Sequence, residues 1–105
     1  MATNRLELLK QMVSQDANNS FARYGLAMEL ANNGELEEGV AEFRTLLERD
    51  ENYAAAYYHF GQALEKLGDV EQARAVYEKG IDVTTRKGDL HARGEIEAAL
   101  NLLPV

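Results

Sequence analysis

The sequence between residues 20 and 87 repeats itself at a spacing of 34 residues. When Ser20–Tyr53 is aligned with Ala54–Lys87, apolar, small and acidic residues fall on residues of the same kind. The aligned pairs include Tyr24 with Tyr58, Leu30 with Leu64, Gly34 with Gly68, Glu37 with Glu71 and Phe43 with Tyr77. A fixed period of this length predicts stacked supersecondary units, and such stacks usually present a surface to another protein.

Helical periodicity covers almost the whole chain, and no segment has the pattern of a strand. We expect six helices joined by short turns, so that helices adjacent in sequence are antiparallel neighbours. Their predicted ranges are 4–15, 21–32, 35–49, 53–67, 70–85 and, after a cap at residue 89, up to about 103. Glycines that tolerate positive φ should end helices, and Asn, Ser or Asp side chains should cap their starts. The expected stops are Gly34, Gly68 and Gly88, and the expected caps are Ser20 or Asn19, Asp69 and Asp89.

Composition limits the classes of function. A chain of 105 residues is one domain by length. Its net charge is −7, and its basic residues are mostly scattered. This argues against nucleic acid, which requires clustered Lys and Arg. The acidic balance either favours a basic partner or serves only solubility.

The chain contains no cysteine, which excludes disulfides, thiolate metal sites and cysteine nucleophiles. The first residues lead into an amphipathic segment unlike a signal peptide. No apolar run approaches the ~20 residues that span a bilayer. We therefore expect a soluble cytoplasmic protein with no membrane contact.

Small residues recur at matching places within each repeat. Ala27 and Gly39 lie 12 residues apart, and so do Gly61 and Ala73. In an antiparallel hairpin, each pair can face across the two helices and let their backbones approach closely. Larger apolar residues flank these positions: Leu26, Leu30 and Phe43 in the first unit, and Phe60, Leu64 and Tyr77 in the second.

These positions resemble the tetratricopeptide repeat. Residues 54–87 carry its pattern at Tyr57, Phe60-Gly61, Leu64, Gly68-Asp69, Ala73, Tyr77 and Gly80. Residues 20–53 carry it at Leu26-Ala27, Leu30, Gly34-Glu35, Gly39 and Phe43, with departures at Arg23, Leu46 and Glu51. The resemblance implies an all-α solenoid of antiparallel helix hairpins with a right-handed superhelix. It implies one domain over residues 1–105, divided into a half-repeat helix (4–16), two repeats (20–53 and 54–87) and a capping helix (89–103). The last helix does not keep register, because Glu95 would fall on a small-residue position.

The resemblance also implies a site, because the first helix of each such repeat lines a concave groove. The corresponding positions here are Phe21, Tyr24, Met28 and Ala31, then Ala55, Tyr58, Gln62 and Glu65. His59 should point near the groove as a hydrogen-bonding contact rather than a metal ligand. Arg93 is the one basic residue expected to reach it. Some family members hold a peptide carboxylate with Lys and Asn side chains. Those positions include Tyr24, Met28 and His59 here, so carboxylate capture is not expected.

We therefore expect a protein or peptide partner, with a basic character favoured by the net charge, and no cofactor or metal. The predicted groove residues are Phe21, Tyr24, Met28, Tyr58, His59, Gln62 and Arg93. An enzyme is not expected, because the two histidines lie on different helices and no Ser-His-Asp pattern or phosphate loop is present. Two alternatives stay open. Phe21 and Tyr24 could simply pack against the first helix, and Leu8 and Leu102 could support a homodimer through the terminal helices.

Overall fold

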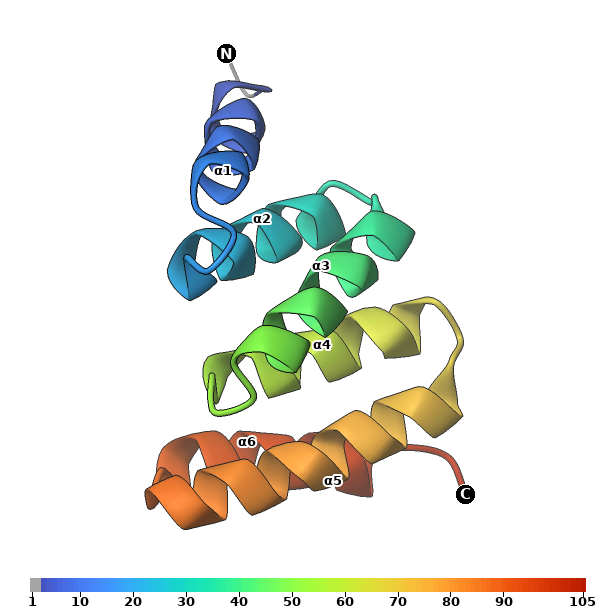
Figure 1. The fold of residues 1–105 in the computed structure, drawn as a ribbon. Coiled ribbons are helices and arrows are strands. Elements are labelled where there is room, and N and C mark those ends of the chain that lie inside the picture. Colours follow the sequence, from blue (N-terminus) through green and yellow to red (C-terminus); the bar gives the residue numbers. More distant parts are fainter. Residues whose placement is uncertain (1–2) are drawn as a thin grey trace.

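The computed structural model describes residues 3–105, with the side chains of residues 5–105. This range folds into six α-helices and contains no strand. In chain order they are α1 (Thr3–Gln15), α2 (Ser20–Asn32), α3 (Leu36–Arg49), α4 (Ala55–Lys66), α5 (Val70–Lys87) and α6 (Leu90–Asn101) (Figure 1). The predicted class and helix number are confirmed, and seven boundaries differ by one or two residues. Helices α1 and α2 start one residue earlier, α3 starts one residue later, α4 is shorter at both ends, α5 ends two residues later, and α6 ends before Leu102. The single-domain assignment also includes Met1 and Ala2, which lie outside the described residues.

The predicted glycine stops end three of the helices in the same way. Gly34, Gly68 and Gly88 have φ angles of 86°, 82° and 71°. In each case the amide after the glycine donates to the carbonyl five residues earlier, at 2.9 Å. This bond satisfies a carbonyl that the helix end would otherwise leave unpaired. The local sequence alone therefore sets these stops.

Side chains cap three of the helix starts. Asn19, Asp69 and Asp89 each accept a hydrogen bond from the backbone amide three residues later, at 3.0–3.1 Å. Of the two residues predicted as possible caps of α2, Asn19 is the one that caps it. The Ser20 hydroxyl instead donates to the Asp50 carboxylate at 2.8 Å and so ties the start of α2 to the end of α3.

The helices form a stack in which each one packs against its neighbours in the chain (Figure 1). Beyond these neighbours, α2 contacts α4 and α4 contacts α6. The three helices therefore make one continuous row. Helices α1 and α6 lie at opposite ends of the stack (Figure 1), and the molecule measures 39 × 28 × 21 Å.

Close approach of two helices in each hairpin depends on glycine. A Cβ atom at Gly39 would lie 3.2 Å from the carbonyl oxygen of Ala27, so the predicted pairing across α2 and α3 is confirmed. In the hairpin of α4 and α5, a Cβ atom at Gly61 would overlap the ring of Tyr77. That ring is fully buried. The side chain nearest to Gly61 is therefore that of Tyr77, which fills the space between the helices. The predicted pairing of Gly61 with Ala73 across this hairpin stays a prediction.

Arg23 is a departure from the repeat pattern, and it is buried. Its guanidinium Nη1 lies 2.7 Å from the Glu42 carboxylate, and its Nη2 donates to the Ala17 carbonyl at 3.1 Å. Tyr57 occupies the equivalent place in the next repeat and donates its hydroxyl to the Glu51 carbonyl at 2.6 Å. Because Ala17 and Glu51 are also 34 residues apart, the arginine and the tyrosine make the same hydrogen bond from the same buried slot.

The first helix joins the stack through a small apolar cluster of its own. Leu9 packs with Leu26 and Leu30 of α2, and all three are buried. Leu8, on the same helix, is 56% exposed. Leu8 therefore lies off the apolar face with which α1 packs against α2.

Candidate functional site

The row of α2, α4 and α6 carries the predicted groove residues. A hollow of about 180 Å³ lies between α2 and α4. It brings together Met28, Tyr58, His59 and Gln62, four of the seven residues predicted for the site. The same hollow is also lined by Ala31, Asn32, Phe43, Ala63 and Lys66. The packing of α2 against α4 thus places residues from two repeats around one hollow.

Tyr24 lies beside this hollow in a cluster of aromatic rings. Its ring centroid is 6.0 Å from that of His59 and 5.4 Å from that of Tyr53. The His59 ring is 5.2 Å from Tyr58 in an edge-on arrangement. Tyr24 and Tyr58 are therefore linked through His59 rather than by direct stacking, and none of the four rings is fully buried.

The tyrosines of this cluster differ from the core tyrosines in how their hydroxyls are used. The hydroxyl of Tyr57 donates to a backbone carbonyl, and that of Tyr77 donates to Glu65 and accepts from Gln62. Among the described residues, the hydroxyls of Tyr24 and Tyr58 and the ring nitrogens of His59 have no hydrogen-bond partner. The core tyrosines are thus occupied by the fold, whereas the groove presents polar atoms that a ligand can engage.

Burial and charge shape the electrostatics of the cluster. Burial raises the pKa of Tyr24, and the charges of Tyr53 and Glu95 raise it further. Burial lowers the pKa of His59 from 6.5, and Glu95 opposes this change. His59 is therefore mainly neutral at pH 7. The carboxylate of Glu95 acts on rings from two other helices, so α6 contributes charge to the groove.

Two of the predicted residues lie away from this hollow. Phe21 is 75% exposed at the start of α2 and does not line it. Arg93 pairs with Glu97 at 3.5 Å on its own helix. Among the residues of α6, the charge that acts on Tyr24 and His59 is that of Glu95.

Sequence reasoning missed Glu95 and Lys66. The repeat register placed Glu95 at a buried small-residue position. In the structure Ile96 is fully buried, with its side chain against Gly80, and Glu95 is exposed. Lys66 directly follows Glu65, the last groove position taken from the repeat. Including the residue after that position would have added Lys66 to the predicted site.

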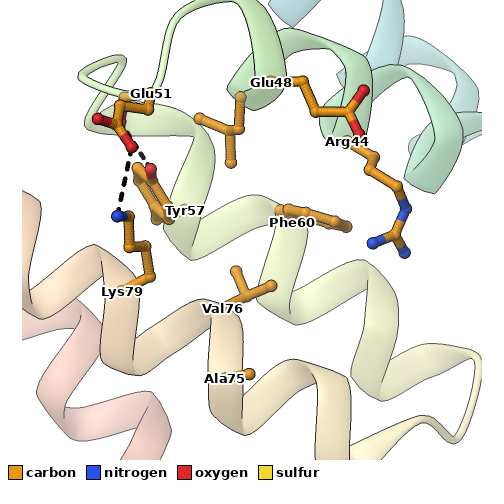
Figure 2. Close-up of a pocket in the computed structure, with 9 residues that line it drawn as sticks. Arg44, Glu48, Glu51, Tyr57, Phe60, Ala75, Val76 and Lys79 are labelled. Carbon is orange, nitrogen blue, oxygen red and sulfur yellow. Dashed lines mark hydrogen bonds and ion pairs between the residues drawn. The ribbon is translucent and has the colours of Figure 1, made fainter.

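A second hollow, of about 340 Å³, lies between α3 and α5 (Figure 2). Phe60 and Val76 face it (Figure 2), and the Arg44 guanidinium sits 5.4 Å from the Phe60 ring. Its two basic side chains already have partners within the fold: Lys79 pairs with Glu51 at 3.3 Å, and Arg44 donates to Gln72 at 2.8 Å. This hollow is larger than the one between α2 and α4, but we regard it as a seam between repeats because both of its basic side chains are engaged within the fold.

Other kinds of site have little support in residues 3–105. Within this range, no three His, Asp or Glu side chains are grouped so as to hold a metal ion. The described helices are also too short or too polar to cross a bilayer.

The fold and groove define a class of protein, the α-solenoid built from helical hairpins. The family model for the tetratricopeptide repeat matches residues 22–53 and 54–85, which together make up more than half of the chain. The chain therefore belongs to the tetratricopeptide repeat family.

Known relatives agree with this assignment. A TPR repeat-containing protein of Pseudomonas aeruginosa is 28% identical over 98 residues, which cover 93% of each chain. The crystal structure of a tetratricopeptide repeat domain protein from Salinibacter ruber matches with a TM-score of 0.74 and 32% identity, over 78% of this chain and 92% of that one. The crystal structure of YrrB, described as a TPR protein with an unusual peptide-binding site, matches with a TM-score of 0.81 and 28% identity, over 92% of this chain and 47% of YrrB.

Proposed function

We propose that this protein is a protein-interaction module that binds an extended peptide or protein segment in the groove of α2, α4 and α6. The residues that contact the partner are Tyr24, Met28, Tyr58, His59 and Gln62. An apolar side chain of the partner enters the hollow between α2 and α4. Phe21 and Arg93 stay in the proposal as contacts at the margins of the groove.

One observation carries this proposal: the groove holds aromatic rings whose polar atoms are unused by the fold. Tyrosine supplies a large contact area at a low cost in side-chain entropy, and buried tyrosines are frequent anchors of protein interfaces. Met28 adds a flexible apolar surface that adapts to different side chains. The peptide-binding site named for YrrB, whose fold extends over 92% of this chain, supports the same kind of role here.

The contact pattern supports the proposed division of the chain. Helix α1 packs against α2 as α3 packs against α4, which is the arrangement expected when residues 4–16 are the second helix of a half-repeat. Helix α6 packs on α4 and α5 at the end of the stack, where the proposed cap at residues 89–103 covers apolar surface. These divisions remain our proposal.

Selection from a displayed library of random 12-residue peptides tests groove binding. The library is selected on the wild-type protein, and recovered peptides are assayed by fluorescence anisotropy on Tyr58→Ala. We expect the variant to lose affinity by about tenfold, because truncation of an interface anchor typically costs more than 1 kcal/mol. Val76→Ala, a truncation in the hollow of Figure 2, is the matched control and should keep full affinity.

The result can also go against the groove. If the peptides bind Tyr58→Ala as tightly as the wild type, the binding site lies outside the groove. The same conclusion follows if they lose affinity for Val76→Ala but not for Tyr58→Ala. Circular dichroism of each variant shows whether helicity is retained. A loss of binding that follows unfolding would also overturn the proposal.

Self-association is a second candidate function, favoured by exposed leucines at both ends of the stack. Leu8 is 56% exposed and Leu102 is 85% exposed. Apolar side chains in such places promote contacts between copies of a protein. If the ends associate, sedimentation equilibrium will show a mass that rises with concentration, and Leu8→Glu or Leu102→Glu will restore the monomer. A monomeric mass at every concentration tested would exclude this function.

A further inference from the structure

Three helices each contribute one group to a cluster at the groove. Tyr24 comes from α2 and His59 from α4, with their ring centroids 6.0 Å apart. Glu95 comes from α6, which packs directly against α4, and its carboxylate influences both rings. Its nearest basic group is His91, at 4.0 Å on the same helix and largely exposed. The cluster therefore combines aromatic faces with a carboxylate that has no Lys or Arg partner among the described residues.

This combination matches the chemistry of a cation. Aromatic faces attract an ammonium or guanidinium group within about 6 Å of the ring centroid. A neutral imidazole accepts a hydrogen bond, and a carboxylate adds charge. Tyr53, which lies 5.4 Å from Tyr24, extends the aromatic surface on one side. Arg93, which lies on the same helix as Glu95, is already paired with Glu97 at 3.5 Å.

One basic residue, Lys66, lines the hollow. A bound cation must therefore lie away from it. Lys66 is seven residues beyond His59 on α4, which corresponds to about 10 Å along a helix. Charges at that separation are largely screened at physiological salt. The cluster around His59 is therefore separated electrostatically from Lys66.

We propose that the groove recognises a basic segment, and that a lysine or arginine side chain of the partner binds between Tyr24, His59 and Glu95. A neighbouring apolar side chain of the same segment occupies the hollow lined by Met28 and Tyr58. This inference rests on the proposed peptide-binding function and assigns the chemistry of its partner.

The 12-residue peptides that depend on Tyr58 provide the test. We expect most of them to carry a lysine or arginine at a fixed spacing from an apolar residue. Replacing that basic residue with norleucine should lower the affinity, and so should Glu95→Gln. For a half-exposed carboxylate the expected loss is about threefold to fivefold. Glu78→Gln removes the same charge from the exposed face of α5 and should leave the affinity unchanged.

The outcomes separate the two proposals. If Tyr58-dependent peptides are acidic or purely apolar, or if Glu95→Gln binds basic peptides as tightly as the wild type, the basic segment is excluded and groove binding stands. If Glu78→Gln weakens binding as much as Glu95→Gln does, the loss of affinity comes from the change in net charge. The cluster of Tyr24, His59 and Glu95 then does not bind the basic side chain. If no selected peptide depends on Tyr58, both groove binding and this inference fail.

Discussion

Arg23→Ala is expected to destabilise the fold by about 3 kcal/mol, the lower end of the range for breaking a buried ion pair. The Arg23 side chain is 9% exposed and that of Glu42 is 29% exposed, so the loss leaves a carboxylate with limited access to water. It also removes the donor to the Ala17 carbonyl. Urea unfolding followed by circular dichroism measures the change. The expected loss is a large part of the free energy of unfolding, which is ~5–15 kcal/mol for a domain of this size.

Arg23→Tyr is the matched variant, because the equivalent slot in the second repeat holds Tyr57. A tyrosine can fill the same space and donate to the Ala17 carbonyl, as Tyr57 does to that of Glu51. We expect it to recover more than half of the stability lost in Arg23→Ala. If the two variants unfold at the same urea concentration, the slot does not require a long donor side chain, and the proposed equivalence of the repeats at this position is wrong.

Gly61→Ala is expected to destabilise the fold by about 2 kcal/mol. The new methyl group would overlap the Tyr77 ring, which is fully buried and has its hydroxyl bonded to Glu65. Overpacking of a core costs about 1–3 kcal/mol. Alanine has a better helix propensity than glycine, worth about 1 kcal/mol, and this offsets part of the upper limit of about 3 kcal/mol for overpacking. The same urea titration measures the result.

Gly94→Ala is the control for this change. Gly94 is exposed within α6, and a Cβ atom there would have no neighbour within 4 Å. We expect a gain of about 0.5–1 kcal/mol, because only helix propensity changes. Opposite signs for the two glycines would show that close packing, and not backbone freedom, requires glycine at position 61. A stabilised Gly61→Ala protein would contradict the packing between α4 and α5.

The groove could be predicted in part. The resemblance to the repeat family predicts Met28, Tyr58, His59 and Gln62 as groove residues, and the structure places all four at one hollow. Their role in binding stays a prediction. The roles of Phe21 and Arg93 could not be derived in this way. Phe21 lies at the exposed start of its helix, and Arg93 belongs to a helix that has lost the register.

The sequence by itself determined the helices and their ends. Gly34, Gly68 and Gly88 stop helices, and Asp69 and Asp89 start them, through bonds that reach no more than five residues along the chain. Such interactions are local, so the residues that make them can be recognised without knowledge of the rest of the fold.

Only the tertiary structure decided which groups meet across helices. It paired Arg23 with Glu42, seated Ile96 rather than Glu95 in the core, and directed the charge of Glu95 toward Tyr24 and His59. It also showed that the basic side chains of the larger hollow are engaged within the fold, whereas the hydroxyls of Tyr24 and Tyr58 in the groove are free to bind. These features depend on how helices far apart in sequence pack together, and a repeat period specifies that packing only where the register is kept.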